Sequence, residues 1–191
     1  MTIEPHPLGF FLPKNTRLLM LGSFPPPRRR WSMEFYYPNI QNDMWRVLGL
    51  LFYASKDYFL KDRKAFCVEK AKAFCQEKGI GLGDTAMEVI RQKANASDKF
   101  LEVVRPIEPE KVLSQIPACE AIAVTGQKAL DTLLPLLPVS ETPKVGGSVE
   151  FRWGDKSMRL YRMPSTSRAY PKPIEEKAAI YRTMFEEIRI L

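Results

Sequence analysis

The fold is decided by Arg17-Leu18-Leu19-Met20-Leu21-Gly22, which runs directly into Ser23-Phe24-Pro25-Pro26-Pro27. A short apolar run closed by glycine is typical of a β-strand that is buried on both faces. A second run of this kind is Ala121-Ile122-Ala123-Val124-Thr125-Gly126. The segment 158–163 alternates more strongly and predicts a third strand, nearer the edge of the sheet.

Amphipathic helices are predicted between and after these strands. Apolar residues recur at spacings of three and four in the segments 44–52, 67–75, 130–134 and 174–188. Strands that alternate with helices predict an α/β fold, with a mostly parallel sheet covered by helices on both sides. The stretches 95–109 and 135–147 are expected to be loops.

Length and composition indicate a single globular domain over residues 1–191. The chain is 45% hydrophobic and carries 29 Lys and Arg against 22 Asp and Glu. It has no run of eighteen apolar residues, and its N-terminus lacks the pattern of a secretory signal, so a cytoplasmic protein is expected. The net charge of +7 permits a polyanionic partner but does not identify one.

The scarcity of histidine and cysteine disfavours several chemistries. His6 is the only histidine and lies near a terminus expected to be loose, which argues against a Ser-His-Asp triad or a Cys-His pair. Cys67, Cys75 and Cys119 form no CxxC pair, which disfavours an iron–sulfur cluster or a structural zinc site. Cys67 and Cys75 are predicted to be small core residues. No metal or other cofactor is expected.

Polar and proline-rich segments follow each predicted strand. In parallel sheets ligands bind at the carboxyl ends of the strands, so these segments are expected to converge on one edge of the sheet. They are 23–27, 127–128 and 164–167.

Two interpretations stay open for the segment 22–30. Its three prolines stiffen the backbone, and Arg28, Arg29 and Arg30 follow them. The segment is either a rigid pocket loop whose arginines reach phosphates, or a surface connection with a solvated charge run.

The other two segments are equally open when taken alone. Asn42 follows Tyr36 and Tyr37 and is either a pocket residue or an ordinary helix N-cap. Ser165-Thr166-Ser167 suits phosphate contact, or it is an unremarkable turn.

Taken in order, these segments resemble the motifs of the uracil-DNA glycosylase superfamily. They are Gly-Ser-Phe-Pro from Gly22, Tyr-Tyr-x-x-x-x-Asn-x-x-Trp from Tyr36, and Pro-Ser-Thr-Ser from Pro164. Two intermediate stretches are similar to family segments written Gly-Ile-Ala-Leu-Trp-Asp-Val and Asn-Gly-x-Lys-Ala; they are Gly79-Ile80-Gly81-Leu82-Gly83-Asp84-Thr85 and Thr125-Gly126-Gln127-Lys128-Ala129. The resemblance is strongest to the branch of mismatch-specific and hypoxanthine (deoxyinosine) DNA glycosylases.

This resemblance implies a three-layer α/β/α sandwich with a short central sheet, and hydrolysis of the N-glycosidic bond of a damaged or deaminated base in base excision repair. It implies that Asn42 is catalytic and that Tyr37 stacks on a flipped base. It places Gly22, Ser23, Phe24, Pro25 and Asn39 around the base pocket. The DNA-binding residues it implies are Arg28, Arg29, Arg30, Ser165, Thr166, Ser167 and Arg168. The expected partner is DNA that contains a damaged or mismatched base. No association with a membrane is expected, and the protein is expected to be a monomer.

Several positions depart from the family pattern. Phe24 stands where uracil-specific members carry Asp or Asn to position water, although the hypoxanthine branch also lacks that polar group. Asn39-Ile40 replaces His-Pro, Met44 replaces Phe, Gly83 replaces Trp, and Arg168 replaces Pro. Two alternatives therefore stay open, a catalytically altered member that only binds nucleic acid and a hydrolase of free nucleosides or nucleotides.

Overall fold

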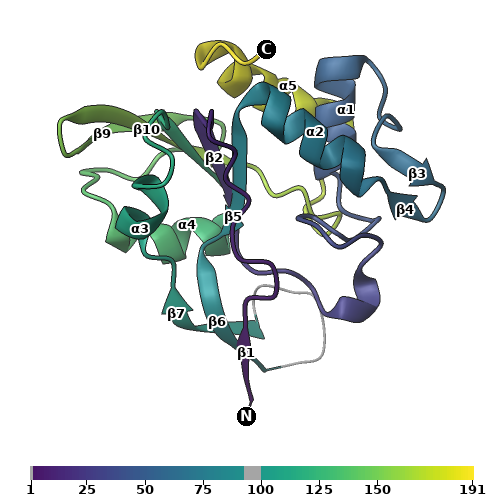
Figure 1. Ribbon diagram of the computed structural model, residues 1–191, viewed down its shortest axis with the longest axis horizontal. Helices are drawn as coiled ribbons and strands as arrows, with labels where there is room; N and C mark the ends of the chain where they lie inside the picture. The colour runs from purple at the N-terminus through teal and green to yellow at the C-terminus, as the bar shows by residue number, and fades with distance from the viewer. Residues whose placement is uncertain (1, 93–99) are drawn as a thin grey trace.

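The computed structural model describes residues 2–92 and 100–191 and is built around a five-stranded sheet (Figure 1). The order of the strands is β5-β2-β8-β10-β9, with the first four parallel and β9 antiparallel at one edge. Their bounds are Ile80–Asp84 for β5, Leu18–Gly22 for β2, Ala121–Thr125 for β8, Lys156–Met163 for β10 and Ser148–Trp153 for β9. The mostly parallel sheet predicted from the sequence is confirmed.

Helices cover both faces of this sheet, which completes the three-layer α/β/α sandwich. One core cluster joins the sheet to α1 (Met44–Tyr53), α2 (Val68–Lys78) and α5 (Ile174–Glu187). A second cluster joins the other face to α3 (Pro109–Leu113), α4 (Gln127–Leu133) and the short 3-10 helix η3 (Leu134–Leu136). Because both faces are covered, all five residues of β2 and of β8 are buried.

Strand β5 was not predicted, and its glycines explain why. The amino-terminal segment runs along the outer edge of β5, where the backbone of Phe11 pairs with Leu82 in an antiparallel bridge. A Cβ atom at Gly83 would lie 2.4 Å from Cδ1 of Phe10. The space that a large side chain would need at position 83 is therefore occupied by the Phe10 ring, and the strand lacks a continuous apolar run.

A second, antiparallel sheet was also missed. It has the order β1-β6-β7 and consists of Ile3–Pro5, Ala86–Arg91 and Leu101–Pro106. The expectation of a loop over 95–109 is wrong for β7 and α3, while residues 95–99 lie outside the described residues. The remaining elements are a hairpin of β3 (Leu60–Asp62) and β4 (Ala65–Phe66) and the 3-10 helix η1 (Arg28–Arg30).

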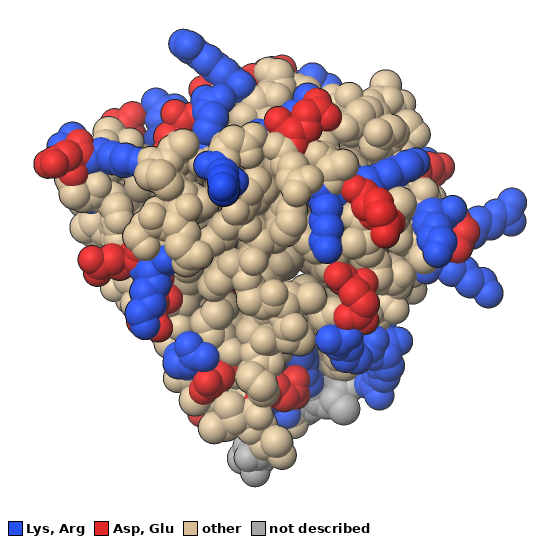
Figure 2. Space-filling model, viewed as in Figure 1, with Lys and Arg blue, Asp and Glu red and all other residues tan. Residues whose placement is uncertain are grey.

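Charged side chains are unevenly spread over the face in Figure 2, which is viewed as in Figure 1. Its middle is largely uncharged, and Lys and Arg side chains gather at the lower right, near the place of η1 in Figure 1. Within residues 2–92 and 100–191, none of the helices has the length and apolar character needed to cross a bilayer.

Candidate active site

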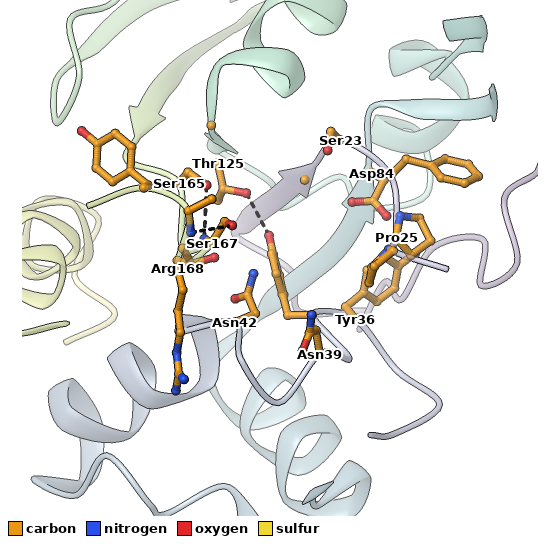
Figure 3. A pocket seen from close by; sticks show the side chains of 18 of the residues that line it. Ser23, Pro25, Tyr36, Asn39, Asn42, Asp84, Thr125, Ser165, Ser167 and Arg168 are labelled. Carbon is orange, nitrogen blue, oxygen red and sulfur yellow. Dashed lines mark hydrogen bonds between the residues drawn. The ribbon is translucent and has the colours of Figure 1, made fainter. Parts of the chain in front are cut away.

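A cleft of about 750 Å³ opens at the carboxyl ends of the parallel strands (Figure 3). Its walls come from the last residue of β5, from the residues at and after the ends of β2, β8 and β10, and from the loop that precedes α1. The predicted convergence of the three segments on one edge of the sheet is therefore confirmed. The sequence-predicted residues that line the cleft are Gly22, Ser23, Phe24, Pro25, Arg30, Tyr37, Asn39, Asn42, Ser165, Thr166, Ser167 and Arg168.

Tyr37 forms part of the cleft wall in an unusual backbone conformation. Its φ is +52°, in the left-handed region that non-glycine residues rarely adopt. Its hydroxyl lies 3.2 Å from Oγ1 of Thr125, at the end of β8, and burial raises the pKa of this hydroxyl. The phenol therefore stays neutral, and the hydrogen bond holds the ring across the cleft. Such strain is typical of residues whose position serves a site.

The side-chain amide of Asn42 has two separate roles available to it. Its Oδ1 accepts the backbone N–H of Met44, the first residue of α1, at 2.9 Å. The N-cap residue of α1 is Asp43, so Asn42 lies one position before it, and its oxygen satisfies the first N–H of the helix from there. Within the described residues the Nδ2 group has no hydrogen-bond partner, and the side chain lines the cleft (Figure 3). Capping uses the acceptor of this amide and leaves its donor for a ligand.

A buried ion pair joins the start of α1 to the loop after β10. Nζ of Lys177, on α5, lies 3.1 Å from Oδ2 of Asp43 and donates to the carbonyl of Ser167 at 3.1 Å. Nε of Arg168 lies 3.4 Å from Oδ1 of Asp43, and the backbone N–H of Asp43 donates to the carbonyl of Thr166. The predicted catalytic and phosphate segments are therefore fixed to each other.

The loop after β10 presents only part of what the sequence predicts. The Ser165 hydroxyl accepts the backbone N–H of Ser167, and the Ser167 hydroxyl accepts that of Ala169, both at 3.2 Å. Thr166 is 2% exposed, so it offers little surface to a phosphate. Ser165, Ser167 and Arg168 are the members of this segment that a phosphate can meet.

The side chain of Phe24 lies in an apolar cluster. Its side chain packs with Ala86, Val89 and Leu101 of the second sheet, and Arg91 donates from Nη2 to the carbonyl of Pro25 at 3.1 Å. The second sheet thus anchors the stiff loop after β2 and places its backbone along the cleft.

The three consecutive arginines differ in whether they line the cleft. Arg28 forms an ion pair with Glu34 and lies 4.3 Å from the ring centroid of Trp31. Arg30 is exposed and lines the cleft, whereas Arg28 and Arg29 do not line it. Arg162, which sequence analysis did not single out, also lines the cleft and donates to the side chain of Gln127.

The expectation of a loose terminus around His6 is wrong. Nε2 of His6 lies 2.8 Å from Oδ2 of Asp84, and both side chains are at least nine-tenths buried. Asp84 ends β5 and lines the cleft. These two residues are 78 positions apart, so no spacing in the sequence pairs them. The available signal for Asp84 was its match to the aspartate of the family segment Gly-Ile-Ala-Leu-Trp-Asp-Val.

Gly22 allows the Asp84 carboxylate to approach the cleft floor. A Cβ atom at position 22 would lie 2.4 Å from Oδ1 of Asp84 and 3.8 Å from the Tyr37 hydroxyl. The glycine is required by this close approach. Among the described residues no three His, Cys, Asp or Glu side chains are grouped so that they could hold a metal ion.

Comparison with known proteins identifies solved structures that have the same fold. No family model matches the chain, and no curated protein matches it. Solved structures do match, and one is the solution NMR structure of a "putative Uracil DNA glycosylase" from Methanosarcina acetivorans. It is 22% identical, with a TM-score of 0.63, over 96% of this chain and 99% of that one. The chain therefore has the uracil-DNA-glycosylase-like α/β fold.

Proposed function

We propose that this protein is a DNA glycosylase. It hydrolyses the N-glycosidic bond of a deaminated base, of the hypoxanthine or uracil type, in base excision repair. The observation that carries the proposal is the meeting of the Asn42 amide donor and the Tyr37 ring in one cleft. The likeness of the fold to the Methanosarcina protein supports the same activity.

The cleft suits one nucleotide and excludes a duplex. Its volume of about 750 Å³ lies within the range of small-molecule sites. A base inside a duplex must therefore rotate out of the stack before it can enter, as enzymes that act on bases require. The Tyr37 ring offers a flat surface on which the extruded base stacks.

Asn42 supplies the electrostatic part of the reaction. When the C–N bond breaks, its electron pair leaves with the base, positive charge develops on the sugar, and water adds to C1′ with loss of a proton. The Nδ2 group donates a hydrogen bond to a carbonyl oxygen of the departing base, where negative charge accumulates. A donor that is already fixed in place stabilises such a transition state without reorganisation.

The mouth of the cleft provides contacts for the DNA backbone. Arg30 and Arg162 line the cleft, and Ser165, Ser167 and Arg168 lie on the loop beside it. Hydroxyls, backbone amides and arginines are the groups that most often contact phosphate, and such contacts position DNA without reading its sequence.

The test is incubation of the protein with oligonucleotides that each carry uracil, hypoxanthine, xanthine or a G·T mismatch. Alkaline cleavage then reveals abasic sites. We expect strand cleavage with one or more of the deaminated bases and none with an undamaged duplex. A chain that binds these duplexes but generates no abasic site in any of them contradicts the proposal.

A second candidate function is binding of nucleic acid without catalysis. The observation that favours it is the burial of Phe24 in an apolar cluster, at the position where uracil-specific enzymes carry a polar group for water. A third, hydrolysis of free nucleosides or nucleotides, leaves the arginines at the mouth without a role. The dependence of duplex affinity on salt separates it from the other two, because phosphate contacts give a steep slope.

A further inference from the structure

The His6–Asp84 pair has a fixed arrangement of protons. Nδ1 of His6 accepts the backbone N–H groups of Leu8 at 3.2 Å and Gly9 at 3.1 Å. A ring nitrogen that accepts hydrogen bonds carries no proton, so the proton of the neutral ring is on Nε2. Nε2 therefore donates to Oδ2 of Asp84, at 2.8 Å. One oxygen of the carboxylate is occupied by this bond.

The other oxygen belongs to the cleft. Oδ1 of Asp84 and the hydroxyl of Tyr37 approach the same point above Gly22, at 2.4 Å and 3.8 Å from the position of a Cβ atom there. No described residue donates a hydrogen bond to Oδ1. Figure 3 shows Asp84 and Asn42 reaching the cleft from different sides. The carboxylate thus lies at the hydroxyl end of the Tyr37 ring, opposite the catalytic amide.

If the proposed function is correct, Oδ1 of Asp84 lies where the polar edge of a bound base is located. A flipped nucleotide stays joined to its strand, so its sugar lies at the mouth of the cleft. The base then extends inward over the Tyr37 ring. Its polar edge, on the side away from the sugar, meets Oδ1 of Asp84 at the hydroxyl end of that ring.

A carboxylate at this place distinguishes a deaminated base from its parent. An ionised carboxylate only accepts hydrogen bonds. Deamination converts N1 of adenine, an acceptor, into the N1–H donor of hypoxanthine, and it converts N3 of cytosine into the N3–H donor of uracil. We propose that Asp84, positioned by His6, recognises this ring N–H and rejects the parent base, whose lone pair would face the carboxylate.

The experiment measures binding, so that its outcome does not depend on cleavage. Duplexes carry one 2′-fluoro nucleotide, because the fluorine slows bond breakage by destabilising positive charge on the sugar. The base at that nucleotide is hypoxanthine, 1-methylhypoxanthine or adenine, always opposite the same partner. The proteins are the unmodified chain, Asp84→Asn, His6→Gln, His6→Phe, and Asp155→Asn, which changes an exposed carboxylate in the turn between β9 and β10.

We expect the unmodified chain to bind hypoxanthine about tenfold more tightly than 1-methylhypoxanthine or adenine, because a site built around a hydrogen bond rejects a ligand that cannot make it. Asp84→Asn brings the hypoxanthine-to-adenine ratio close to one, since an amide offers both a donor and an acceptor. His6→Gln keeps the ratio because glutamine can still donate to Asp84, whereas His6→Phe lowers it. Asp155→Asn leaves it unchanged.

Two results overturn the inference. One is a ratio near one for the unmodified chain. The other is an unaltered ratio in Asp84→Asn, including the case in which this variant loses cleavage rate, because the carboxylate would then act on water or on the sugar. Thermal unfolding of each variant separates lost folding from lost recognition. Absence of base release from every oligonucleotide contradicts the proposed function, and the binding ratio still decides the role of Asp84.

Discussion

At the scale of the residue, substitutions of Asn42 can separate the role of its side-chain oxygen from the role of its side-chain NH2 group. Asn42→Asp keeps an oxygen to accept the Met44 N–H and removes the Nδ2 donor, whereas Asn42→Ala removes both. We expect both variants to lose at least about a hundredfold in single-turnover cleavage, because one oriented donor typically contributes that much. Loss of the cap should lower the free energy of unfolding by about 1 kcal/mol in Asn42→Ala alone. Near-normal cleavage by Asn42→Asp would leave capping as the sole role of this side chain.

Two substitutions of Tyr37 likewise separate the contribution of the aromatic ring from that of the hydroxyl. Tyr37→Phe keeps the stacking surface and loses only the bond to Thr125, whereas Tyr37→Ala loses the ring. Stacking on an aromatic ring contributes about 1–3 kcal/mol per base, so Tyr37→Ala should weaken binding of the damaged duplex about five- to 150-fold. Affinity for an undamaged duplex should stay the same in both variants. An equal loss of affinity for both duplexes would refute the stacking role.

At the scale of the element, the Asp43–Lys177 pair determines how α1, α5 and the loop after β10 are held together. Lys177→Met leaves the buried Asp43 with the half-exposed Arg168, 3.4 Å away, as its remaining ion-pair partner, and should cost about 3–5 kcal/mol in urea unfolding. The double variant with Asp43→Asn should recover part of this loss. Lys172→Met, which breaks the more exposed pair with Glu176, is the matched control and should cost at most about 1 kcal/mol. Equal losses in both single variants would show that burial of the pair is unimportant.

Elements were predictable from the sequence where burial leaves a local pattern. Strands β2 and β8 are buried on both faces and therefore carry continuous apolar runs, and the stripe of α5 repeats with the period of a helix. Strand β5 escaped prediction because its glycines make room for residues from the amino-terminal segment. The His6–Asp84 pair and the pairing of β1 with β6 join residues that are far apart in the sequence, which no local pattern records.

At the scale of the whole molecule, the basic surface can be divided into cations that face the cleft and cations that do not. Arg30→Gln should lower the slope of log affinity against log salt by about one unit, because one phosphate contact is lost. Arg28→Gln is the matched control from the same short helix, and its existing pair with Glu34 should make the change smaller. The loss should be alike for damaged and undamaged duplexes. Unaltered slopes for both variants would remove the electrostatic support for DNA binding.

The amino-terminal segment has a consequence beyond the cleft. Strand β5 is the last strand of its sheet, and the exchange of hydrogen bonds between Phe11 and Leu82 occupies part of an edge on which a second chain could otherwise nucleate aggregation. The same segment supplies His6. If Asp84 recognises the base as proposed, a change that loosens this segment would expose the edge of β5 and displace His6 from Asp84 at the same time.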